Sequence, residues 1–212
     1  RRMAIDQGRD IFGVAVDSWH EYHNQVVPEI AARKVKASTI VVDSISFLAQ
    51  IMWADLQGTR AHLTQQDFGT GLRRLGETTR DMVAATMPRG DHPGYHMVFT
   101  THLRDVTNEQ GALLKVSPLI MGQFKDQLEA YFDYAVLTSA EMLTKTEKVN
   151  GVTKAVHSRQ FKVITSPPDR YNTCKGGNLP AEILISDGSL AFDEMNKTWK
   201  LGTPATAETQ SS

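Results

Sequence analysis

Two short apolar runs and two stretches with helical spacing dominate the first half of the chain. Residues 39–43 (TIVVD) and 95–101 (YHMVFTT) are rich in β-branched and aromatic side chains and have the length of strands. Such runs indicate strands that are buried on both faces, as in a parallel sheet. Residues 44–56 and 70–87 carry apolar side chains three and four positions apart, which predicts two helices. The order of these elements predicts an α/β fold with a largely parallel sheet.

The N-terminal segment has a weaker pattern. Residues 11–16 (IFGVAV) predict a short strand. Asp17 and Ser18 predict the cap of a helix over residues 19–34 (WHEYHNQVVPEIAARK). Because proline lacks an amide hydrogen, Pro28 predicts a break or a kink in the middle of that helix.

The second half of the chain carries signals for hairpins. Turn residues at 108–111 (NEQG) separate residues 103–106 from 112–116, and those at 150–151 (NG) separate residues 147–149 from 152–156, which predicts two β-hairpins. The other elements that we expect are a short helix within residues 118–128 and strands at residues 134–139 and 161–165. We expect one core over residues 1–200 and a disordered tail over residues 201–212.

Composition narrows the class of protein. The chain has 212 residues, 41% of them hydrophobic, with 23 basic and 24 acidic side chains, so any contact with nucleic acid must be a local patch. A single cysteine, Cys174, excludes a disulfide framework and a cysteine-rich zinc module. No apolar run approaches the roughly 18 residues of a membrane span, and no secretory leader is visible. We therefore expect a soluble cytoplasmic protein without membrane partners.

Asp43 ends the first predicted strand. A carboxylate at the C-terminal end of a central parallel strand lies at the crevice where such sheets bind ligands. There it can hold the water shell of Mg²⁺ on a nucleotide phosphate. The alternative is that Asp43, together with Ser44, only caps the helix that follows. The residues alone leave both interpretations open.

The second predicted strand also runs into polar residues, Thr101 and His102. In a parallel sheet its end lies at the same edge as Asp43. A hydroxyl and an imidazole at that edge can sense a γ-phosphate or orient an attacking water. The alternative is a solvated strand end without a chemical role.

Taken together, residues 40–44 (IVVDS), the long helix, and residues 97–102 (MVFTTH) followed by LRD resemble the core of the RecA-like ATPases. The chain is most similar to the small RecA-like ATPases that phages encode for recombination. Further segments that agree in order are QDFG at 66–69, SPLIMG at 117–122, YFD at 131–133, FKV at 161–163 and DRY at 169–171. The resemblance covers roughly residues 38–185 and depends on order and spacing.

The resemblance implies a RecA-like P-loop NTPase core with ATP and Mg²⁺ as cofactors. Asp43 would be the Walker B acid that holds Mg²⁺ through water, with Ser44 beside it in the nucleotide site. Thr101 and His102 would be the sensor at the end of the neighbouring strand.

The resemblance also implies an oligomer, either a filament or a ring, because such ATPases place their sites between subunits. Lys162, Arg170 or Lys175 would then reach the phosphates of a neighbouring subunit's nucleotide and stabilise developing charge. The alternative for all three is a solvated basic loop.

The implied nucleic-acid partner is single-stranded DNA, with phage recombination or single-strand-binding proteins as further partners. The family places mobile loops after the sensor strand and after the next strand, here residues 104–115 and 140–154. Basic residues for contacts with phosphates are Arg104, Lys115, Lys145, Lys148 and Lys154. The alternative is two exposed hairpins with solubilising charge.

The sequence departs from the family at the phosphate-binding loop. G-x-x-x-x-G-K-[ST] should precede Asp43, and it does not. Residues 8–13 (GRDIFG) and 71–76 (GLRRLG) have the glycine spacing, but Val14 and Glu77 stand where the lysine should be, and the second segment is predicted to be helical.

We therefore expect the phosphate-binding loop upstream of Arg1, since the chain does not open with methionine. The catalytic glutamate of the family normally precedes the Walker B strand; Glu21 and Glu29 both fit that interval. Two alternatives stay open: a P-loop-less structural or adaptor protein that binds no nucleotide, and a ring helicase or DNA-packaging ATPase on the same core.

Overall fold

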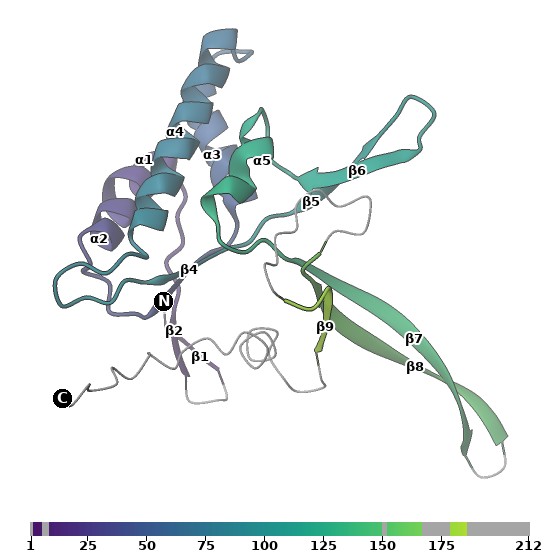
Figure 1. Cartoon of the computed structure of the whole chain (residues 1–212). Helices are drawn as coiled ribbons and strands as arrows, with labels where there is room; N and C mark the ends of the chain where they lie inside the picture. Colours follow the sequence, from purple (N-terminus) through teal and green to yellow (C-terminus); the bar gives the residue numbers. More distant parts are fainter. Residues whose placement is uncertain (1, 6–8, 150–151, 167–178, 186–212) are drawn as a thin grey trace, which may run out of the picture. The chain divides into compact units, whose positions relative to one another are not determined.

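The computed structural model describes residues 2–5, 9–149, 152–166 and 179–185. Two compact units make up the chain (Figure 1). The first comprises Arg1–Arg104 with Pro118–Tyr131, and the second comprises Asp105–Ser117 with Phe132–Ser212. Within the described ranges, no helix has both the length and the apolar character that crossing a membrane requires.

The sheets of the first unit are small. β3 (Thr39–Val42) and β4 (His96–Phe99) form a parallel pair, in register from Thr39 opposite His96 to Val42 opposite Phe99. β1 (Arg2–Ile5) and β2 (Arg9–Phe12) form a separate antiparallel pair. The strand predicted at residues 11–16 therefore lies a little earlier in the chain.

The helical segment that follows β2 is continuous in spite of its proline. It comprises α1 (Trp19–Glu21), the π-helical turn η1 (Tyr22–Val26) and α2 (Val27–Ala31). Ser18 caps it as predicted, because its Oγ accepts the Glu21 amide hydrogen over 3.1 Å. Pro28 stands in the first turn of α2, directly after the wider π turn. Proline lacks an amide hydrogen, so this local widening replaces the predicted break.

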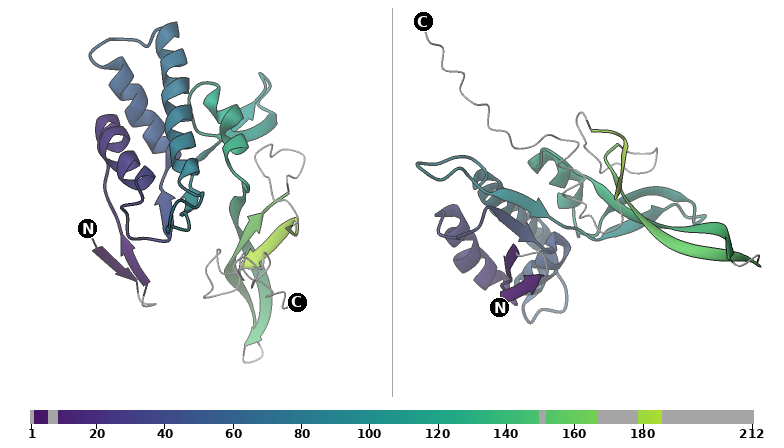
Figure 2. Two further views of the ribbon diagram at one scale, coloured as in Figure 1. Left: turned by 60° about the vertical axis from the view of Figure 1, so that its left-hand side comes forward. Right: turned by 90° about the horizontal axis from the view of Figure 1, so that it is seen from below.

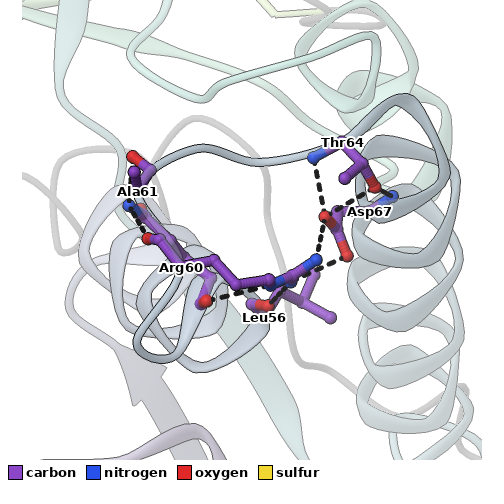
Figure 3. Close-up of polar contacts among 6 residues, drawn as sticks. Leu56, Arg60, Ala61, Thr64 and Asp67 are labelled. Atoms are coloured by element: carbon purple, nitrogen blue, oxygen red, sulfur yellow. Dashed lines mark hydrogen bonds and ion pairs between the residues drawn. The ribbon is translucent and has the colours of Figure 1, made fainter.

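Two longer helices connect β3 to β4. α3 (Ile45–Gln57) has Ser44 as its N-cap, and α4 (Gln65–Ala84) packs against α3. The helix predicted over residues 70–87 begins earlier than expected, at Gln65, and ends at Ala84. A capping box explains the early start: the Asp67 amide donates to Thr64 Oγ1, and the Asp67 carboxylate accepts the Thr64 amide hydrogen over 2.7 Å (Figure 3).

The glycine-rich segment of residues 71–76 lies within α4, which confirms its helical interpretation. A Cβ on Gly71 would come within 2.3 Å of the buried indole ring of Trp53. A Cβ on Gly76 would come within 3.1 Å of the Tyr131 hydroxyl. These two glycines therefore let α3 and the short helix η2 (Leu128–Tyr131), which follows α5 (Phe124–Gln127), approach α4 closely.

The second unit contains most of β5 (Leu103–Thr107), which pairs with β6 (Leu113–Pro118) as the first predicted hairpin. Asn108 closes the turn, because its Oδ1 accepts the amide hydrogens of Gln110 and Ala112. The second predicted hairpin is longer than expected (Figure 2). β7 (Leu137–Val149) and β8 (Val152–Ile164) each have 13 residues and run antiparallel.

β9 (Glu182–Ile185) pairs antiparallel with the end of β8. Val163 and Ile183 are buried there, with Val136 and Ile185 packed against them. The strands predicted at residues 134–139 and 161–165 are parts of this three-stranded sheet. The predicted tail at residues 201–212 lies outside the described residues.

The structure thus confirms a fold that mixes helices with sheets. Among the described strands, however, only β3 and β4 are paired in parallel, and the other registered pairs are antiparallel. The connections explain the difference. A parallel pair needs a long crossover, which α3 and α4 supply between β3 and β4, whereas short connections join neighbouring strands into antiparallel hairpins.

Candidate functional site

The candidate site lies at the carboxyl ends of β3 and β4, within the first unit. The main chains stay joined beyond the strands, since the Thr100 amide donates to the Val42 carbonyl and the Ile45 amide donates to the Thr100 carbonyl, each over 3.0 Å. These hydrogen bonds confirm the prediction that the two strand ends meet. The peptide bond between Asp43 and Ser44, directly after β3, is cis.

Thr100 contacts Asp43 directly. Its Oγ1 donates a hydrogen bond of 2.5 Å to Oδ1 of Asp43, and both residues are exposed. A hydrogen bond from a hydroxyl to a carboxylate is charge-assisted and short. Among the described residues, Oδ2 of Asp43 accepts no hydrogen bond, so Thr100 orients the carboxylate and leaves one oxygen for a ligand.

The same geometry tests the capping interpretation of this segment. Ser44 is buried, and its Oγ accepts the amide hydrogen of Phe47 over 3.3 Å, which makes it the N-cap of α3. Asp43 does not cap the helix. The Ser44 oxygen is thus engaged in the cap, whereas the Asp43 carboxylate lies at the surface of the strand ends.

Thr101 and His102 are held by a serine in the first turn of α3. The Oγ of Ser46, which is 1% exposed, lies 3.0 Å from Thr101 Oγ1 and accepts the His102 amide hydrogen over 3.1 Å. The carbonyl of His102 accepts the Leu119 amide hydrogen over 2.7 Å. The main chain at His102 is therefore fixed on both sides, while its side chain is exposed.

Sequence reasoning missed Thr100 and Ser46 as members of the site. The double threonine at the end of β4 contained a usable signal, because successive residues of an extended chain point to opposite sides. Only one of Thr100 and Thr101 can therefore face Asp43. The sequence does not tell which of the two faces Asp43, because both residues are threonines.

Lys162 lies in β8, in the second unit, and its charge is compensated. Its Nζ is 2.6 Å from Glu141 Oε1 and 3.4 Å from Glu182 Oε1. The hydrogen bond to Glu141 raises the pKa of Lys162, although partial burial opposes the rise. Arg170 and Lys175, the two other predicted phosphate contacts, lie outside the described residues.

The predicted DNA contacts lie on strands of both hairpins. Arg104 is an exposed residue of β5, and Lys115 lies in β6. Lys145 and Lys148 belong to β7 and Lys154 to β8, with Lys154 in register with Glu147. The loops predicted over residues 104–115 and 140–154 are thus mainly paired strands.

The two candidates for the catalytic glutamate make local contacts. Glu21 accepts the Asp17 amide hydrogen over 3.3 Å at the start of α1. Glu29 forms an ion pair of 2.9 Å with Lys34 at the end of α2. These contacts belong to the ends of the helical segment and do not distinguish the two residues chemically.

An open cleft of about 260 Å³ lies elsewhere in the first unit, beside α1, η1, α3 and α4. Its charges are largely paired: Arg74 bonds Asp55 over 2.7 Å, and Arg73 lies 3.6 Å from Glu77. None of the residues at the ends of β3 and β4 lines it. This balance of charges favours no particular class of ligand.

Within the described parts of the chain, no group of three or more His, Cys, Asp or Glu side chains could enclose a metal ion. The single exposed carboxylate of Asp43 fits a different kind of site. Mg²⁺ keeps most of its waters and commonly binds through one or two carboxylates together with substrate phosphates. A lone exposed carboxylate such as that of Asp43 would suit a Mg²⁺ ion held mainly by the phosphates of a nucleotide.

Comparison of the chain with protein-family models, with curated proteins and with solved structures gave no match. The interpretation of the site therefore depends on its own residues, on their geometry and on the chemistry that the two strand ends allow.

Proposed function

We propose that the chain is part of a RecA-like ATPase that hydrolyses ATP with Mg²⁺ and acts with single-stranded DNA in phage recombination or repair, in the cytoplasm of the host cell. The observation that carries the proposal is the hydrogen bond between Thr100 and Asp43 across the ends of two parallel strands. It gives the acid of the predicted Walker B segment a fixed orientation at the edge where parallel sheets bind ligands.

The residues at this edge have complementary roles in the proposal. Mg²⁺ bound with ATP would neutralise the charge that develops on the transferred phosphoryl group. Asp43 would hold this hydrated ion through Oδ2, the oxygen that Thr100 does not contact. His102 supplies an exposed imidazole at the end of the neighbouring strand, as a donor toward a phosphate oxygen or the attacking water.

The proposal requires a phosphate-binding loop that residues 1–212 do not supply, since G-x-x-x-x-G-K-[ST] is not in this sequence. We propose that it comes from another part of the polypeptide and that the site is completed in a filament or ring. Arg170 and Lys175 are then candidates for contacts with a neighbouring subunit's nucleotide. Lys162 is a weaker candidate, because it is already paired with Glu141 and Glu182.

The single-stranded DNA partner is supported by basic residues on the strands of the two hairpins, β5–β6 and β7–β8. The predicted contacts were Arg104, Lys115, Lys145, Lys148 and Lys154. Both hairpins offer exposed strand surface on which a sugar–phosphate backbone can lie.

The direct test is the rate of ATP hydrolysis by the full-length protein with Mg²⁺ and oligothymidine. Asp43→Asn keeps the size of the side chain and removes its charge, so we expect the rate to fall roughly a hundredfold or more. Asp81→Asn, an exposed acid of α4, is the matched control and should leave the rate unchanged.

Unchanged hydrolysis in Asp43→Asn would remove this acid from the mechanism. A full-length protein that binds no nucleotide would instead favour the structural or adaptor alternative. Closed rings on DNA, seen by electron microscopy, would favour the helicase or packaging alternative over the recombination filament.

A further inference from the structure

The β7–β8 ribbon has two chemically different faces. Residues that stand directly opposite each other in an antiparallel pair share a face, and the faces alternate along each strand. The register pairs Ala140 with Phe161, Met142 with Arg159 and Thr144 with His157; these six residues define the Phe161 face. The alternating pairs on the other side are Ser139 with Lys162, Glu141 with Gln160 and Leu143 with Ser158; these six define the Lys162 face.

Charge is distributed unequally between the two faces. The Lys162 face contains Glu141, which forms an ion pair with Lys162 over 2.6 Å. The Phe161 face contains no acid, and its exposed Arg159 makes no ion pair with any described residue. Its exposed His157 shares a hydrogen bond of 3.0 Å with Thr144. A polyanion would therefore meet an uncompensated cation on the Phe161 face and a neutralised one on the Lys162 face.

The Phe161 face also exposes apolar side chains beside its cation. Phe161 is 47% exposed and Met142, diagonally across the ribbon from it, is 64% exposed. Phe161 and His157 lie four residues apart in β8, which is about 13 Å along a strand. That length corresponds to about four stacked bases. Exposed aromatic rings beside basic side chains are the combination on which single-stranded nucleic acids stack.

We propose that the Phe161 face binds single-stranded nucleic acid, with bases stacked on Phe161 and Met142 and phosphates held by Arg159 and His157. The inference rests on the DNA partner of the proposed function but needs no ATP hydrolysis. It places the main contact on Phe161, Arg159 and His157 rather than on the predicted basic residues. A protein partner would also suit exposed apolar groups, but the unpaired cation on an acid-free face favours a polyanion.

The test is equilibrium binding of a fluorescent oligothymidine to the full chain without nucleotide, followed by anisotropy at several salt concentrations. Phe161→Leu keeps an apolar side chain in the sheet and removes the aromatic ring. We expect it to weaken binding roughly tenfold, in the range of one lost base stack. Leu184→Ala is the matched control, because Leu184 is 55% exposed and stands opposite Lys162 on the other face.

A second pair of variants tests the charge. Arg159→Gln and Lys162→Gln each remove one positive charge from neighbouring parts of β8. We expect Arg159→Gln to weaken binding and to reduce the slope of log Kd against log salt by about 0.7. Lys162→Gln should change neither, because its charge is already compensated. Circular dichroism of every variant checks that the sheet is intact.

The outcomes separate this inference from the proposed ATPase. Equal weakening by Arg159→Gln and Lys162→Gln, or by Phe161→Leu and Leu184→Ala, would overturn the assignment to one face. An oligothymidine that does not bind at low salt would overturn it as well, as would variants that change only self-association. Loss of hydrolysis in Asp43→Asn with oligothymidine binding intact would support both proposals.

Discussion

Thr100 Oγ1 donates a hydrogen bond of 2.5 Å to Asp43 Oδ1 and thereby joins two residues that are 57 positions apart in the chain. The bond exists because β3 and β4 are parallel neighbours that end at the same edge. It orients a surface carboxylate that does not cap the following helix, since Ser44 does so. The site is thus defined by a contact between two strand ends.

Replacing Thr100 with valine should slow ATP hydrolysis. Valine keeps the shape of threonine but cannot donate to Asp43, and a hydrogen bond to a charged group contributes about 1.5–3 kcal/mol. We expect kcat to fall roughly ten- to hundredfold, with Thr100→Ser close to the wild type because it retains the hydroxyl. Steady-state kinetics with oligothymidine measures both, and equal rates for the valine and serine variants would contradict this role.

Ser46→Ala should destabilise the first unit. The change removes the acceptor of the partly buried His102 amide hydrogen, and the loss of such a hydrogen bond costs about 0.5–1.5 kcal/mol. Urea unfolding measures the loss, and amide hydrogen exchange at His102 should become faster. Ser38→Ala is the matched control, because the Ser38 side chain is exposed, and should lie within about 0.5 kcal/mol of the wild type. If Ser46→Ala were as stable as Ser38→Ala, the hydrogen bonds of the Ser46 hydroxyl would contribute nothing to the free energy of unfolding.

Gly71→Ala and Gly69→Ala should have opposite effects on stability, although both glycines lie in α4. A methyl group at Gly71 would meet the Trp53 ring, and such overpacking costs about 1–3 kcal/mol. A methyl group at Gly69 meets nothing within 4 Å, so the helix should gain about 0.5–1 kcal/mol from the loss of glycine. Thermal unfolding compares the two, and stabilisation by both changes would refute the close contact with Trp53.

Asp67 should make the stability of the first unit depend on pH in acid. Hydrogen bonds from Arg60 and from Thr64 lower the pKa of Asp67 to about 2 (Figure 3). An acid with a lowered pKa stabilises the folded state above its ordinary pKa of about 3.9, and this contribution disappears as the pH falls from about 4 to 2. Urea unfolding of the wild type and of Asp67→Asn should therefore differ at pH 5 and converge near pH 2. If the two proteins differed in their free energy of unfolding by the same amount at pH 5 and pH 2, the lowered pKa of Asp67 would be contradicted.

The order of strand, helix pair and strand around Asp43 could be predicted because continuous β-branched runs and helical spacing are visible in the sequence. The start of α4 could not be predicted. Its capping box of Thr64 and Asp67 lies in a polar segment without the apolar spacing that indicates a helix. The sequence also could not predict that Thr100 rather than Thr101 contacts Asp43, because this depends on the orientation of the main chain at the end of β4. The length of the β7–β8 hairpin could not be predicted either. Many of its residues, Thr144 and His157 among them, are polar and exposed, so the sequence shows no apolar run that would indicate long strands.

In the proposed mechanism, Thr100 acts through Asp43 on a nucleotide-bound Mg²⁺. A double-mutant cycle in full-length protein tests it most directly, by calorimetric binding of a non-hydrolysable ATP analogue with and without Mg²⁺. We predict that Thr100→Val and Asp43→Asn each reduce the gain in affinity that Mg²⁺ provides, and that the double variant loses no more than Asp43→Asn alone. If the losses of affinity in the two single variants added up in the double variant, Thr100 would not act through Asp43. Equal affinity of the wild type for the ATP analogue with and without Mg²⁺ would also contradict this mechanism.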